Sequence, residues 1–69
     1  MKIFGENVVH AESKEIDGIV YDRFDSATCG IIRTTDKDSG EVIAIVKYPS
    51  LDSVRAEYAN AVEMASRCS

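Results

Sequence analysis

The chain has 69 residues, of which 45% are hydrophobic and 29% charged, and its eight basic and twelve acidic side chains give a formal net charge of −4. A chain of this length forms one domain that buries only about 60% of the surface its unfolded form exposes, so it needs an efficient core, a cross-link or a partner. The composition excludes an ordinary disordered tail, and basic residues spread along the whole chain argue against direct nucleic-acid binding.

The N-terminal half predicts a β-hairpin. Residues Lys2 to Phe4 begin a first strand or form a short separate piece that ends at Gly5. Asp17 and Gly18 form a two-residue turn because both positions need positive φ, and the strands on either side span about residues 7–16 and 19–25. This register places three pairs of residues opposite each other: Ile16 with Ile19, Lys14 with Tyr21, and Glu12 with Arg23. It also places His10 opposite Asp25.

Two further strands follow, over about residues 28–35 and 41–48, because β-branched residues dominate both runs. The loop DKDSG joins them, and Asp36 opposite Glu41 sets their register. This register divides the apolar residues between two faces of the sheet. One face carries Cys29, Ile31, Val42, Ala44, Val46 and Tyr48, and the other carries Ile32, Ile43 and Ile45 with Thr34.

A helix over about residues 51–68 ends the chain. Pro49 interrupts the strand and Ser50 is a favourable N-cap. Apolar residues then recur at steps of three and four: Leu51, Val54, Tyr58, Ala61, Ala65 and Cys68, with Val62 and Met64 broadening the stripe. We therefore predict an α+β fold, an antiparallel β-meander of three to four strands followed by one C-terminal α-helix packed on one sheet face. Small side chains favour the face that carries Ala44.

One helix covers only one face of such a sheet, yet both faces are apolar at the centre of the last two strands. In an antiparallel sheet with one face exposed to solvent, the strands normally alternate more cleanly between polar and apolar residues. We expect a cover over the second face: the N-terminal segment around Ile3 and Phe4, a second copy of the chain, or another protein. The candidate partner-binding residues are therefore Ile32, Ile43, Ile45 and Thr34.

The loop also contains Asp36, Asp38 and Gly40 at the spacing found at the start of calcium-binding loops. In such a loop the fifth and twelfth positions are ligands, but here they are Gly40 and Lys47, so we read the segment as a turn. His10 has no second metal ligand or catalytic partner at a suitable spacing. We expect no catalytic residue, no metal and no cofactor. Cys29 and Cys68, the two cysteines, are expected to be reduced thiols.

The leading interpretation is a small non-enzymatic protein-binding module, a regulator or inhibitor of the kind encoded by viruses or mobile elements. It acts by protein–protein association through the second sheet face, for which a homodimer is one form. The alternative is an acidic module whose carboxylates Asp36, Asp38 and Glu41 block a basic nucleic-acid-binding groove of a partner. No apolar segment approaches the ~20 residues of a membrane span and no signal peptide is visible, so we expect a cytoplasmic protein with no membrane contact.

Overall fold

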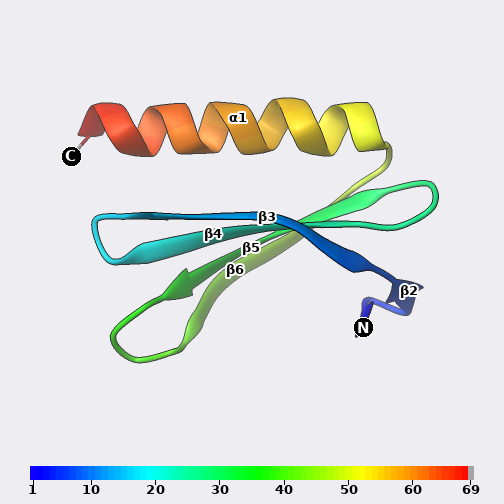
Figure 1. Cartoon of the computed structure of the whole chain (residues 1–69), viewed down its shortest axis with the longest axis horizontal. Coiled ribbons are helices and arrows are strands. Elements are labelled where there is room, and N and C mark those ends of the chain that lie inside the picture. Colours follow the sequence, from blue (N-terminus) through cyan, green and yellow to red (C-terminus); the bar gives the residue numbers. More distant parts are fainter. Residues whose placement is uncertain (69) are drawn as a thin grey trace.

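A computed structural model describes residues 1–68, except for the side chain of Cys68. In this range the chain forms a four-stranded antiparallel sheet, a separate two-stranded hairpin and one C-terminal helix, which is the predicted α+β fold (Figure 1). The large sheet is a meander with the order β3-β4-β5-β6, and β1 pairs with β2. The elements are β1 (Lys2–Ile3), β2 (Glu6–Asn7), β3 (Val9–Ile16), β4 (Ile19–Asp25), β5 (Gly30–Asp36), β6 (Val42–Tyr48) and α1 (Leu51–Cys68).

The turn between β3 and β4 forms as predicted. Asp17 and Gly18 have φ values of 52° and 77°, the left-handed conformations that this kind of hairpin requires. All three predicted residue pairs are present in the ladder. The pairing then shifts by one residue at Ala11, which is a β-bulge. His10 therefore lies opposite Phe24, and its predicted pairing with Asp25 was wrong.

A second bulge lies in β6, and it changes the faces of the sheet. The Asp36 N–H donates to the Glu41 carbonyl at 2.8 Å, so the predicted register holds beside the loop. Ile43 is then an extra residue, because Thr35 pairs with Val42 while Thr34 pairs with Ala44. A shift of one residue exchanges the two faces of a strand. The predicted division of apolar residues between the faces was therefore wrong for β5 relative to β6.

The start of α1 follows its predicted N-cap. The Ser50 Oγ accepts a hydrogen bond from the Ser53 N–H at 3.1 Å, which satisfies one of the free donors at the helix start. Farther along, Glu63 and Arg67 form an ion pair at 2.6 Å, as their spacing of four residues predicts. Met64 was predicted to broaden the buried stripe, but this was wrong, because Met64 is 54% exposed.

The helix packs on the sheet face that carries Ala44, as predicted, but Ile32 lies on the same face. Val54 and Tyr58 of α1 are 0% and 4% exposed and form a buried cluster with Ile32. The Tyr58 hydroxyl donates to the Tyr21 carbonyl at 2.7 Å, which links the middle of the helix to β4. The main core of the protein therefore lies between α1 and the centre of the sheet.

The N-terminal hairpin covers part of the opposite face, so the helix and the hairpin lie on different sides of the sheet (Figure 1). Val8, which follows β2, is buried with Phe24 and Ile31, and Ile3 and Ile45 pack against this cluster. Of the three covers that the sequence left open, the N-terminal segment is thus present in the structure. Phe4 takes little part in it, since it is 58% exposed.

A hydrogen bond from Cys29 links this hairpin to the sheet. Cys29 is a free cysteine, 4% exposed, and its thiol donates to Glu6 Oε1 at 3.3 Å. The Ser26 hydroxyl lies 3.0 Å from the same sulfur. The predicted thiol of Cys68 belongs to a side chain outside the described residues.

Candidate functional site

The four predicted partner-binding residues do not form one surface. Ile32, only 7% exposed, lies beneath α1, and Thr34 shares its face of β5. Ile45 lies on the opposite face and packs against the cluster of Val8, Phe24 and Ile31. Ile43 is 56% exposed at the bulge. The predicted shared face of Ile32, Ile43 and Ile45 is wrong, because the bulge at Ile43 was not foreseen.

Exposed apolar side chains gather instead along β6, the last strand of the sheet. Val42, Ile43 and Val46 are 48%, 56% and 46% exposed, and Ala44 between them is exposed as well. Ala44 and Val46 lie on the helix side of the sheet and Val42 on the opposite side; we call these four exposed residues of the edge strand the β6 surface. One side of β6 pairs with β5, and within residues 1–68 no strand pairs with its other side. The backbone donors and acceptors that point away from β5 are therefore open to an additional strand.

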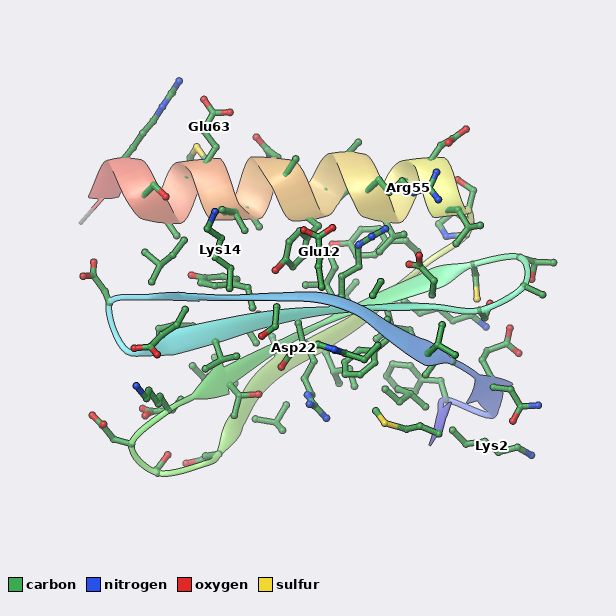
Figure 2. The ribbon with its side chains drawn as sticks, viewed as in Figure 1. Lys2, Glu12, Lys14, Asp22, Arg55 and Glu63 are labelled. Atoms are coloured by element: carbon green, nitrogen blue, oxygen red, sulfur yellow. The ribbon has the colours of Figure 1, made fainter. Side chains whose placement is uncertain are left out.

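The other edge of the sheet, β3, has a different chemistry. It carries Glu12, Lys14 and Glu15 together with the bulge at Ala11, and charges and bulges discourage the pairing of an edge with further strands. Figure 2 shows Glu12 and Lys14 pointing from β3 toward α1. In contrast, Lys47 is the only charged residue of β6. Of the two edges, β6 is the one suited to accept a strand.

Sequence reasoning placed Val42, Ala44 and Val46 under the helix and so missed them as site residues. Ala44 and Val46 do lie on the helix side of β6, but α1 leaves this edge partly open. A usable signal was present in the sequence, since the last strand of a meander is an edge unless the sheet closes or another element pairs with it. A β-branched final strand with one charge therefore predicts an apolar edge strand.

The acidic residues of the alternative interpretation lie in and beside the loop between β5 and β6. Asp36 Oδ1 accepts hydrogen bonds from the N–H groups of Asp38 and Ser39 at 2.9 and 3.3 Å. Gly40, with φ 75°, donates its N–H to the Asp36 carbonyl at 2.8 Å. These contacts form the turn that the sequence predicted. In the described part of the chain no three His, Cys, Asp or Glu side chains are grouped to hold a metal ion.

A polar cluster occupies the sheet face away from α1, where Figure 2 shows Asp22. The Asp22 carboxylate is 2.9 Å from His10 Nε2 and 3.5 Å from an Arg33 guanidinium nitrogen. Burial raises the pKa of Asp22, but hydrogen bonds from Ser13 and His10 and the charge of Arg33 outweigh it, so the pKa lies below its ordinary value. The ionised carboxylate thereby holds β3, β4 and β5 together.

This cluster has the residue types of a catalytic site, but it has no concave surface. The Arg33 guanidinium lies over the Phe24 ring, 4.9 Å from the ring centroid. The rings of His10 and Phe24 contact each other edge to face, with 5.2 Å between their centroids. Residues 1–68 form no pocket here or elsewhere. The contacts of Asp22, His10 and Arg33 are thus accounted for by packing and by the pairing of neighbouring strands.

Comparison with known proteins does not assign the chain to a family. No protein-family model matches it, and neither a curated protein nor a solved structure matches it. In the part of the chain that is described, no helix is long and apolar enough to cross a membrane.

Proposed function

We propose that this protein works by protein–protein association, and that a partner chain adds a strand to the sheet at β6. The observation that carries this proposal is the seven-residue edge strand with exposed Val42, Ile43 and Val46. In strand addition the main-chain hydrogen bonds supply affinity, while alternate side chains supply specificity. Such a module acts without catalysis, as a regulator or inhibitor that occupies a strand-binding surface of its partner.

The exposed side chains set the scale of the binding energy. Complete burial of a Val or Ile side chain contributes about 1.5–3 kcal/mol. Val42, Ile43 and Val46 are each about half exposed, so covering all three contributes about 2–4 kcal/mol before the costs of association. Each net backbone hydrogen bond adds about 0.5–1.5 kcal/mol. These magnitudes favour a reversible complex.

The acidic alternative has less support, because Asp36 already accepts two backbone hydrogen bonds within its own loop. The two mechanisms differ in their response to salt. Binding through carboxylates weakens steeply as salt screens the charges, whereas burial of the β6 surface is much less sensitive. Salt dependence therefore separates them once a partner is in hand.

Site-specific cross-linking tests the proposal. A photoreactive residue replaces Ile43 in the tagged full chain, and cross-linked partners are compared with and without Val46→Lys. Met64→Lys is the matched control, because Met64 is 54% exposed on α1 and Val46 is 46% exposed on β6. We expect cross-linking to survive Met64→Lys and to disappear with Val46→Lys. Cross-linking that survives Val46→Lys but is lost on Asp36→Lys with Asp38→Lys contradicts the proposal.

A further inference from the structure

We infer that the partner at β6 is a second copy of this chain. The β6 strands of two copies pair antiparallel, so that two four-stranded sheets join into one continuous sheet. This inference rests on the proposed function of β6 as a strand-accepting edge, and it names the chemistry of the strand that is accepted.

The sequence of β6 is complementary to itself. Residues 41–47 read EVIAIVK, which is symmetric about Ala44 with opposite charges at its two ends. In a β6 without the bulge, antiparallel pairing about Ala44 places Glu41 opposite Lys47 of the other copy, Val42 opposite Val46, and Ile43 opposite Ile45. Apolar pairs and opposite-charge pairs across strands are stabilising, and like charges directly opposite are not. A site for an unrelated strand has no need of this symmetry.

The bulge at Ile43 restricts where the two-fold axis lies. Residues 44–48 pair regularly with β5, whereas residues before Ile43 are displaced by one. An axis through Ala44 requires β6 to lose this bulge on pairing, because Val42 and Val46 lie on opposite faces in the structure. The axis passes through Ile45, the middle residue of β6, if the bulge persists in the new ladder. With the axis through Ile45, Ala44 of one copy lies opposite Val46 of the other. Lys47 then lies opposite Val42, so no like charges face each other in either register.

Pairing of this kind stops at two copies. The two-fold axis is perpendicular to the sheet, so both helices lie on the same side, and both apolar edges are used. The outer edges of the dimer are the two β3 strands, each with Glu12, Lys14, Glu15 and the bulge at Ala11. The charged residues and the bulge discourage the pairing of β3 with further strands. The dimer also supplies the additional buried surface that a chain of 69 residues lacks on its own.

Light scattering on the full chain, from micromolar to millimolar concentration, measures the association. We expect a dimer whose dissociation constant rises at least tenfold with Val46→Lys and with Ile43→Lys, while Met64→Lys leaves it unchanged. All three positions are about half exposed, so the variants are expected to keep the fold. Far-UV circular dichroism and thermal melting check this before association is compared.

Engineered cysteines determine the register. Residues directly opposite in an antiparallel pair have Cα atoms about 4.5–5.5 Å apart, within the range of about 4.4–6.8 Å that a disulfide bridges. In a Cys68→Ser background, either Ala44→Cys or Ile45→Cys forms a disulfide-linked dimer on mild oxidation, depending on the axis. Val42→Cys is the control, since the two copies of residue 42 are about 13 Å or more apart in both registers. The Cys68→Ser parent, with Cys29 only 4% exposed, also stays unlinked.

Three results overturn the inference: a monomer at millimolar concentration, a dimer indifferent to both lysine variants, or a dimer that neither Ala44→Cys nor Ile45→Cys links. A monomeric chain contradicts only the inference that the partner is a second copy. The proposed function then stands or falls on whether a different protein is cross-linked at position 43, so the two failures are distinguishable.

Discussion

Gly30 lies where β5 passes directly beneath α1, and its replacement by Ala tests how closely the helix and the sheet approach. A methyl group on Gly30 would lie 2.5 Å from Val54 Cβ and 2.8 Å from Val54 Cγ2. Carbon atoms in favourable contact are about 3.5–4.0 Å apart. Val54 is 0% exposed, so its side chain cannot turn into solvent. Gly30→Ala therefore forces α1 away from the sheet or strains both elements.

Overpacking of this kind costs about 1–3 kcal/mol. A chain of 69 residues has a free energy of unfolding of about 3–10 kcal/mol, so the substitution removes a large share of the stability. Each kcal/mol shifts the melting temperature of a domain of this size by about 4–8 °C. Urea and thermal unfolding, followed by far-UV circular dichroism, measure both quantities.

A double variant separates the clash from other effects of the substitution. Val54→Ala alone removes two methyl groups from the core, at about 0.8 kcal/mol each for lost burial, and leaves a cavity. In Gly30→Ala with Val54→Ala the new methyl group occupies part of that space. We expect the double variant to be more stable than the two separate losses predict, by about 0.5–3 kcal/mol. Additive losses, or a Gly30→Ala loss below about 0.5 kcal/mol, refute the close approach of Gly30 to Val54.

Three further variants test other parts of the structure. Tyr58→Phe removes the hydrogen bond to the Tyr21 carbonyl and is expected to cost about 0.5–1.5 kcal/mol. Burial, with the charges of Glu12 and Asp22, raises the pKa of Tyr58 above its ordinary value of 10.0, so the unfolded state ionises first. Stability is thus lost as the pH rises above about 10, and Tyr58→Phe should lack this loss. The pKa of Asp22 is lowered from 3.8, so its contribution is present above about pH 4 and lost as the pH falls through the lowered pKa. Asp22→Asn should flatten the acid unfolding profile there, and equal slopes in both proteins contradict the role of the carboxylate. Val8, 3% exposed, holds the N-terminal hairpin over the sheet, and Val8→Ala should increase the labelling rate of the Cys29 thiol about tenfold. An unchanged rate contradicts this role of Val8.

Features that depend on local chemistry were predictable from the sequence. The turn at Asp17 and Gly18 follows from the need for positive φ, and the cap at Ser50 follows from the free donors of a helix start. The stripe from Leu51 to Ala65 follows from the helical period. Each of these depends on a few neighbouring residues, and each is present in the structure.

The division of residues between sheet faces was not predictable in the same way. It depends on an unbroken alternation over two strands and a loop, and one extra residue reverses it. Neither Ala11 nor Ile43 has a side chain that marks a bulge, and each moves the residues on one side of it by one position. This displacement brought His10 to Asp22 and separated Ile32 from Ile45.

The same displacement changes the kind of interaction that the protein can make. A regular β6 would have placed Ile43 and Ile45 on one face with Ile32, and a partner there would bury side chains alone. In the structure, Ile32 is covered by α1 and Ile45 by the N-terminal hairpin, so the remaining exposed apolar residues of β6 lie along its edge. An edge offers backbone donors and acceptors as well as side chains, which a face does not. The proposed partner at β6 is therefore an extended strand, and EVIAIVK is such a strand within the chain itself.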